Sequence, residues 1–228
     1  MASQRRIPKK RSRGVRAAKP ETDEEKVRKA NIPRELSAKY HPFYEGKVEV
    51  VPRVPIRGIE DFAIWYTPGV AEPCLQIKAD PAKVWQLTNK WNNVAIVTDG
   101  SRVLGLGDIG PEAGLPVMEG KALLFKYLGG VDAFPIPVAT KDPEEIIQFV
   151  KWLTPAFGGV NLEDIAQPKC FRILERLRKE TDIAVWHDDQ QGTATINVAG
   201  VFNALKVVGK RLGDASICLI GSGASNIR

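Results

Sequence analysis

Two adjacent aspartates, Asp188 and Asp189, directly follow a short apolar run at 183–186 that is typical of a buried strand. A Gly-Thr step comes next and indicates the start of a helix. Ligands of open α/β folds bind where strands end, and carboxylate oxygens are the hard ligands that Mg²⁺ and Mn²⁺ prefer. The alternative is a solvated loop in which one aspartate or Thr193 caps the helix. The pair alone leaves both interpretations open.

Acidic residues follow two other predicted strands as well. Asp99 comes after an apolar run at 94–97, and Glu163 and Asp164 come after another at 159–162. If the strands are parallel neighbours, their carboxyl ends share one edge of the sheet, and these carboxylates converge there. Packed like charges destabilise a fold unless a cation lies among them, so we expect a divalent ion. Oxygen ligands favour magnesium or manganese over zinc.

Three further polar residues could do chemistry, but each has a simpler explanation. Lys121 starts a predicted helix and, by its charge alone, is more typical of the surface. Tyr66 lies in a turn, where packing of its ring would explain it equally well. His187 adjoins the aspartate pair, but strand alternation points it away from Asp188. This favours packing or a supporting contact for His187 over metal ligation.

Glycines are concentrated in two segments. Those between Gly105 and Gly114 allow the backbone to approach a ligand, and the apolar residues among them argue against a plain surface loop. The second segment follows a predicted strand at 216–220 and would open a helix, as a dinucleotide-binding turn does. Its candidate contacts are Gly221, Gly223, Ala224, Ser225 and Asn226. Asn226 stands where the third glycine of that turn is expected, and the sequence leaves no room for the rest of a nucleotide-binding domain.

Strands and helices alternate in the predicted order of elements, which indicates parallel βαβ units and an α/β fold. The strands are expected at 94–97, 131–138, 159–162, 183–186 and 216–220, and the helices between them at 118–128, 143–153, 168–180 and 193–209. Upstream, one or two short helices are expected over 21–40, and an edge strand or extended segment over 42–55. A further helix should begin after Pro68 or Pro73.

The net charge of +6 is concentrated at the amino terminus. Residues 1–20 contain eight basic side chains and no acid, so the remainder carries −2. We expect this basic arm to be disordered, with organelle targeting or nucleic-acid binding as alternatives. It has no apolar stretch of the kind found in secretory signals, and no segment of the sequence is long and apolar enough for a transmembrane helix.

The three cysteines, Cys74, Cys170 and Cys218, are far apart and form no CxxC pair. Neither a zinc knuckle nor a disulfide framework is therefore indicated. Each lies in an apolar stretch, which predicts buried free thiols in a reducing compartment such as the cytoplasm.

Taken together, several motifs of this sequence resemble malic enzyme in its short bacterial or archaeal form. They lie at 66–71, 97–100, 104–110, 115–121, 161–164 and 187–194, in the order of that family, and the resemblance covers about residues 40–228. It implies oxidative decarboxylation of malate to pyruvate and carbon dioxide, with Mg²⁺ or Mn²⁺ and with NAD or NADP as cofactors.

The resemblance also implies a role for each matching residue. The metal ligands would be Glu163, Asp164 and Asp189, the general base Lys121 with Asp188 as its partner, the acid Tyr66, and the malate carboxylate ligand Arg102. The domains would be a basic arm at 1–22, a substrate and metal domain at 23–195, and a linking helix with the first strand and glycine turn of a truncated Rossmann-type cofactor domain at 196–228.

We further expect a homodimer, no membrane partner and no nucleic-acid partner. Because the cofactor domain would be incomplete, the resemblance predicts that this chain is inactive alone. Two alternatives remain open: a non-catalytic module for metal binding or dimerisation, and metal-dependent decarboxylation of oxaloacetate without hydride transfer.

Overall fold

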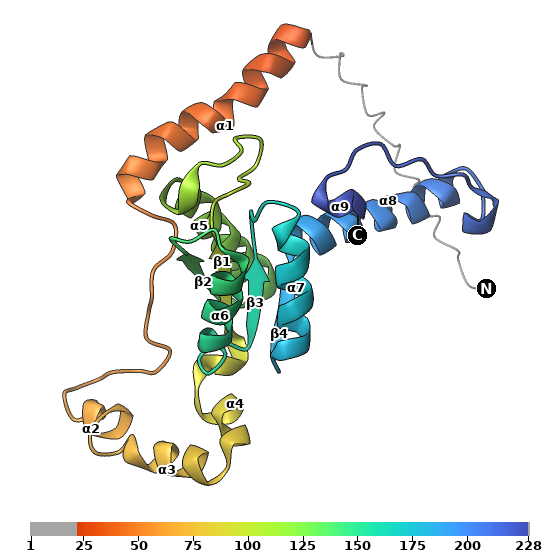
Figure 1. Ribbon diagram of the computed structural model, residues 1–228. Coiled ribbons are helices and arrows are strands. Elements are labelled where there is room, and N and C mark those ends of the chain that lie inside the picture. The colour runs from red at the N-terminus through yellow and green to blue at the C-terminus, as the bar shows by residue number, and fades with distance from the viewer. Residues whose placement is uncertain (1–21, 228) are drawn as a thin grey trace, which may run out of the picture. The chain divides into compact units, whose positions relative to one another are not determined.

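The protein is described here by a computed structural model covering residues 22–227, and its centre is a parallel four-stranded sheet (Figure 1). The strands are β1 (Asn93–Thr98), β2 (Asp132–Pro137), β3 (Gly159–Leu162) and β4 (Ala184–His187), in the spatial order β2-β1-β3-β4. These are four of the predicted strands, and the α/β fold with parallel units is confirmed. The prolines of β2 are accommodated because β2 lies at an edge of the sheet.

Three helices connect the strands: α5 (Gly110–Gly129), α6 (Pro143–Leu153) and α7 (Lys169–Glu180). The predicted starting point of α6 is confirmed, because the side chain of Asp142 accepts hydrogen bonds from two backbone N–H groups in the first turn. The prediction for α5 was too short, because the second half of the glycine-rich segment is already helical.

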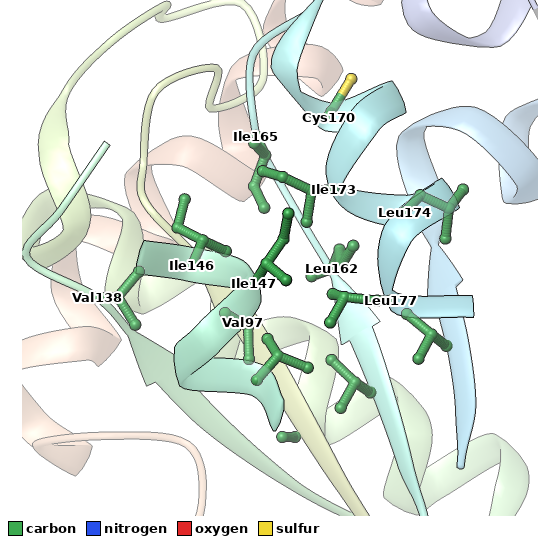
Figure 2. Close-up of a cluster of buried hydrophobic side chains, with 14 residues drawn as sticks. Val97, Val138, Ile146, Ile147, Leu162, Ile165, Cys170, Ile173, Leu174 and Leu177 are labelled. Carbon is green, nitrogen blue, oxygen red and sulfur yellow. The ribbon is translucent and has the colours of Figure 1, made fainter. Parts of the chain in front are cut away.

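Side-chain alternation along β1 divides the core between two faces of the sheet. Ala95 and Val97 belong to the larger buried cluster, in which α6 and α7 pack on one face (Figure 2). Ile96 points to the other face and packs against Met118 and Ala122 of α5. Full burial of each large aliphatic side chain stabilises such a core by roughly 1.5–3 kcal/mol. The loops at the carboxyl ends of the strands are therefore held on a rigid base.

The strand order places β1 between β2 and β3, so the connections that leave β1 and β3 run to opposite sides. In open parallel sheets such a switch point leaves a crevice outside the carboxyl ends of the two strands, and ligands bind there. The acidic residues that follow β1, β3 and β4 lie at this edge of the sheet.

The elements outside the sheet are short except for two helices. The remaining elements of the described chain are α1 (Asp23–Tyr44), α2 (Asp61–Trp65), α3 (Ala71–Ala79), η1 (Pro81–Lys83), α4 (Val84–Leu87), η2 (Asn89–Asn92), η3 (Asp188–Gly192), α8 (Thr193–Val207), η4 (Leu212–Asp214) and α9 (Ala224–Ile227), of which α1 and α8 are the two long helices. The chain divides after Glu45, so that α1 belongs to one unit and all elements from α2 onward belong to the other. The predicted basic arm at 1–20 lies outside the described residues.

Several predictions were wrong. Residues 42–55 contribute the end of α1 and an irregular segment, so of the two alternatives for this region the edge strand was wrong, and 216–220 do not form a strand. A strand needs a neighbour for its backbone hydrogen bonds, and the apolar side chains at 217, 219 and 220 are exposed, without a packing partner. The prediction of three buried thiols was also wrong in part: Cys74 and Cys218 are exposed, whereas Cys170 is buried as expected. None of the helices over 22–227 has the length and hydropathy required to cross a bilayer.

Candidate active site

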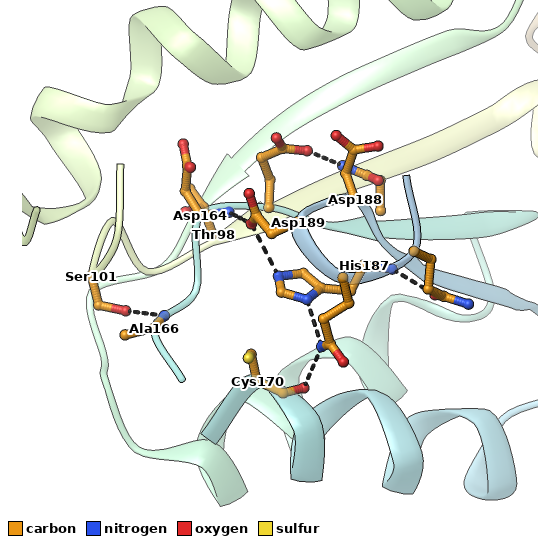
Figure 3. A network of polar contacts seen from close by, with 12 residues as sticks. Thr98, Ser101, Asp164, Ala166, Cys170, His187, Asp188 and Asp189 are labelled. Carbon is orange, nitrogen blue, oxygen red and sulfur yellow. Dashed lines mark hydrogen bonds and ion pairs between the residues drawn. The ribbon is translucent and has the colours of Figure 1, made fainter. Parts of the chain in front are cut away.

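Three carboxylates meet at the carboxyl edge of the sheet (Figure 3). Glu163 and Asp164 directly follow β3, and Asp189 lies in η3, which follows β4. One oxygen atom of each lies within 4.8 Å of the corresponding oxygens of the other two. The structure thus brings together the three acids that the sequence placed in one metal site.

Asp99 does not belong to this cluster, contrary to the expectation that the acids at all three strand ends would converge. Its buried side chain accepts hydrogen bonds from the backbone N–H and the hydroxyl of Ser101, at 3.0 and 2.6 Å. Its other oxygen forms an ion pair with Lys169 at the start of α7. A buried carboxylate with its own cation needs no metal ion, and this explains the different environment of Asp99.

The cluster holds its protons more strongly than ordinary carboxyl groups do. Burial raises the pKa of Glu163 to about 7, although the nearby Lys121 opposes the shift. Burial and the neighbouring charge of Asp189 raise the pKa of Asp164 to about 6. In addition, Oδ2 of Asp164 is buried without a hydrogen-bond partner among the described residues. Hard, partly uncompensated oxygens in this arrangement fit a divalent cation such as Mg²⁺ or Mn²⁺.

Asp189 is the member of the cluster that stays ionised most easily. Burial alone would raise its pKa, but the ring of His187 and the N–H of Asp164 together lower it. The N–H of Asp164 lies 2.8 Å from Oδ2 of Asp189, and Nε2 of His187 lies 3.2 Å from the same oxygen. His187 is fully buried, and its Nδ1 lies 2.6 Å from the side-chain amide of Gln190. It contacts a carboxylate, as predicted for a supporting residue.

Asp188 has a different partner from its neighbour Asp189, because the chain forms a wide turn of π-helical type here. Its Oδ2 lies 2.8 Å from Nζ of Lys121, and that ammonium also lies 3.2 Å from Oε1 of Glu163. Gly192 leaves space for Asp188, since a Cβ atom at position 192 would lie 2.2 Å from Oδ1. The aspartate pair is therefore neither a solvated loop nor a side-chain cap for α8.

Lys121 lies in the middle of α5, not at its start as predicted, and beside the three carboxylates. Burial alone would lower its pKa, but the hydrogen bond and charge of Asp188 and the charge of Glu163 together raise it. A lysine can act as a base near neutral pH only if its pKa is lowered. The protein groups act in the opposite direction, because the two nearest carboxylates favour the ammonium form.

Two predicted site residues lie away from this cluster within the described chain. The side chain of Tyr66 is 70% exposed, and α2, which it follows, lies beyond the end of the sheet where the strands begin (Figure 1). The guanidinium of Arg102 is exposed and donates a hydrogen bond to the carbonyl of Leu104 at 3.2 Å. The backbone N–H of Arg102, however, donates to the carbonyl of Asp164 at 3.0 Å.

The predicted nucleotide turn leads into a helix, as expected. Gly221 has a positive φ of 120°, and α9 begins at Ala224. The side-chain amide of Asn226 lies 3.3 Å from the carbonyl oxygen of Gly221 and so contacts the turn itself. The strand that should precede the turn is absent from the described residues, so the Rossmann-type element stays a prediction.

Asn161 was missed by the sequence reasoning. Its buried side-chain amide donates a hydrogen bond to Oε2 of Glu163 at 2.7 Å. A polar residue within the apolar run at 159–162 was the available signal, because residues two apart in a strand lie on one face. Asn161 therefore orients the first carboxylate of the cluster.

Comparison with known proteins gives a consistent result. The family "Malic enzyme, N-terminal domain" matches residues 45–178. The chain is 57% identical to the NAD-dependent malic enzyme of Geobacillus stearothermophilus, over 80% of this chain and 38% of that protein. It is 46% identical to the NADP-dependent malic enzyme of Haemophilus influenzae, over 85% of this chain and 26% of that protein. The crystal structure of malic enzyme from Pyrococcus horikoshii superposes with a TM-score of 0.81 at 55% identity, covering 86% of this chain and 46% of that one. The chain thus spans less than half the length of each of these proteins.

Proposed function

This chain belongs to the malic enzyme family, and from that premise we propose that its residues serve the oxidative decarboxylation of malate to pyruvate and carbon dioxide, with reduction of NAD or NADP. The single observation that supports this best is the position of Lys121, within salt-bridge distance of Glu163 and Asp188 and next to the cluster of three carboxylates. A proton acceptor beside a cation site is the arrangement that this reaction requires.

In the proposed site, Glu163, Asp164 and Asp189 hold Mg²⁺ or Mn²⁺. The raised pKa values of the first two carboxyls and the unpartnered oxygen of Asp164 support this assignment. The bound ion supplies a Lewis acid that polarises the oxygen on which negative charge develops during decarboxylation. His187 and Asn161 hold two of the carboxylates in place through their contacts.

Lys121 takes the proton from the malate hydroxyl in this proposal. Nζ must be neutral to do so, and the carboxylates of Asp188 and Glu163 oppose that state because they raise its pKa. A divalent ion held by the three clustered carboxylates would favour the neutral amine by charge repulsion. Asp188 fixes the position of Nζ through the 2.8 Å contact and stabilises the positive charge that Nζ gains with the proton.

Substrate and cofactor contacts complete the proposal. The exposed guanidinium of Arg102 binds a malate carboxylate, a task for which its planar pair of donors is suited. The turn from Gly221 to Asn226 contacts the pyrophosphate of NAD or NADP.

The three free cysteines favour a reducing compartment such as the cytoplasm.

We also propose that the chain forms a homodimer in which Tyr66 acts in the site of the second copy. Tyr66 would protonate the enolpyruvate carbon, but within one chain the helix that it follows, α2, lies at the opposite end of the sheet (Figure 1). Phe62, Ile64 and Trp65 of α2, the short helix that Tyr66 follows, are exposed. Large exposed apolar surfaces indicate a protein partner. A second copy would cover this surface.

The test is a pair of assays on this chain with Mn²⁺. NADH or NADPH formation from malate is followed at 340 nm, and the loss of oxaloacetate is followed separately. Lys121→Met should abolish whichever of the two activities the unsubstituted chain shows and leave Mn²⁺ binding intact. Lys151→Met removes an equally long cation from an ion pair with Glu180 and should have no effect. Unchanged turnover in Lys121→Met would refute the proposed base.

Decarboxylation of oxaloacetate without hydride transfer is the second candidate. It is favoured by one observation: the carboxylates and Lys121 are in place, whereas the nucleotide turn lacks its preceding strand among residues 22–227. Loss of oxaloacetate without reduction of NAD or NADP would support it. If the chain binds Mn²⁺ but shows neither activity, a metal-binding or dimerisation module becomes the better interpretation.

A further inference from the structure

Two turns at the carboxyl edge of the sheet are joined by two hydrogen bonds, one to the carbonyl of Asp164 and one from the N–H of Ala166. The turn after β1 supplies the N–H of Arg102, which donates to the carbonyl of Asp164 at 3.0 Å. The same turn supplies the hydroxyl of Ser101, which accepts a hydrogen bond from the N–H of Ala166 at 2.9 Å (Figure 3). The turn that carries Asp164 is thus fixed by its neighbour.

Asp164 needs such support, because its backbone is in the left-handed region, with φ of 54°. Aspartate adopts this conformation more readily than most residues, but it is still an uncommon backbone state, and the hydrogen bonds from the neighbouring turn stabilise it. The left-handed turn directs the carboxylate so that its buried Oδ2 lies within the cluster without a hydrogen-bond partner among the described residues. If the turn relaxed, this oxygen would be the first to leave its position.

The hydroxyl of Ser101 is itself fixed. It donates to Oδ1 of Asp99 at 2.6 Å, and the N–H of Ser101 donates to the same oxygen at 3.0 Å. Asp99 is fully buried and forms an ion pair with Lys169, whose Nζ also donates to the carbonyl of Lys141 at 3.1 Å. The hydroxyl therefore has one orientation, in which its oxygen faces the N–H of Ala166.

We propose that Ser101 is a positioning residue for the metal ligand Asp164, and that the buried Asp99–Lys169 pair serves to orient its hydroxyl. The inference rests on the proposed metal site. It assigns a role to Asp99, a strand-end acid that lies outside the carboxylate cluster: Asp99 acts on the ion indirectly, through Ser101 and the 163–166 turn. Alanine at position 101 would keep the backbone N–H bond to Asp99 but would lose both hydroxyl bonds, the one donated to Asp99 and the one accepted from Ala166.

The test compares two variants that each lose one hydroxyl. Ser101→Ala removes the bond to Ala166, whereas Thr181→Ala removes a hydroxyl bonded to the carbonyl of Leu177 at 2.7 Å, at the far end of α7. Binding of Mn²⁺ is measured by the electron paramagnetic resonance signal of the free ion, and folding by circular dichroism and thermal melting. Ser101→Ala should weaken Mn²⁺ binding by about tenfold, the lower end of the effect of losing a supporting contact. Thr181→Ala should lower the melting temperature without changing Mn²⁺ affinity.

A second measurement needs no variant and so remains decisive if Ser101→Ala fails to fold. Coupling between two sites is reciprocal, so binding of Mg²⁺ should strengthen the bond between Ala166 and Ser101. Exchange of the Ala166 amide hydrogen should then slow by about tenfold in saturating Mg²⁺. The amide of Thr181, which donates to the carbonyl of Leu177 at 3.1 Å, should not change.

The possible results are distinct. Mn²⁺ affinity within twofold of wild type in folded Ser101→Ala, or equal slowing of both amides, would overturn this inference and leave the metal site standing. If the wild-type chain binds neither Mn²⁺ nor Mg²⁺, the metal site fails and the inference fails with it. Weaker binding in Ser101→Ala together with selective slowing at Ala166 supports the proposal.

Discussion

Protons and the divalent ion should compete for the same carboxylates, and the structure allows the competition to be worked out. Glu163 and Asp164, with pKa values of about 7 and about 6, must both be ionised to bind the ion. At pH 6 about 9% and about 50% of these groups are ionised, and at pH 8 nearly all are, so the product rises by roughly 20-fold. Because both pKa values are raised, affinity for Mn²⁺ should increase with pH over this range and level off above it.

Isothermal titration calorimetry with Mn²⁺ at pH 6, 7 and 8 measures this dependence directly. Repeating the titration at pH 6 in buffers of different ionisation enthalpy counts the protons released, which should be about 1.4 per ion bound. Glu163→Gln should bind more weakly at pH 8 and retain only the roughly twofold pH dependence that comes from Asp164. Glu180→Gln, at the far end of α7, is the matched control and should retain the full dependence.

An affinity that is constant between pH 6 and pH 8 would refute this reasoning, as would binding without proton release. Either result would mean that the two carboxyls are ionised at pH 6, and that burial does not govern their pKa values. A full pH dependence in Glu163→Gln would point instead to another titrating group.

Three further predictions concern the turns around the site. Asp188→Asn removes a charge that raises the pKa of Lys121, so the rise of kcat/KM with pH should move toward lower pH, and its maximum should fall by about 10- to 100-fold. Gly192→Ala places a Cβ atom 2.2 Å from Oδ1 of Asp188, and the displaced carboxylate should reduce kcat while the chain stays folded by circular dichroism. Gly100→Ala places a Cβ atom 2.1 Å from the carbonyl oxygen of Gly110 in a backbone with φ of 65°, and urea unfolding should show a loss of at least about 2 kcal/mol.

The parallel sheet and its acidic edge could be predicted from the sequence, since both follow from short-range patterns. A strand such as 94–97 is a continuous apolar run, and the acid that soon follows it marks its end. The strand-end pattern could not show that Asp99 lies outside the cluster, because the ion pair between Asp99 and Lys169 joins residues far apart in the chain. The separate partners of adjacent Asp188 and Asp189 were expected only from the family resemblance, because a π-helical turn has no clear sequence pattern of its own.

The predictions that were wrong concern segments whose structure depends on neighbours. The apolar run at 216–220 satisfies every local requirement of a strand, but it has no other strand to pair with among residues 22–227. The position of Tyr66 could not be predicted for the same reason: the turn motif identifies Tyr66 as a candidate, but it does not show which other residues Tyr66 lies near. Local pattern defines an element, and long-range contacts decide its use.

The left-handed backbone of Asp164 also bears on how proteins with this site can change over time. Aspartate, asparagine and glycine are the residues that adopt this conformation most readily. Both asparagine and glycine are one base change away from either aspartate codon. A single mutation at position 164 can therefore remove a carboxylate while the turn keeps its shape, whereas most other replacements would strain the backbone as well. The same conformation that would place Asp164 in the proposed metal site thus leaves a short mutational route to a folded chain that lacks this carboxylate, and descendants that have lost the proposed reaction should carry asparagine or glycine here.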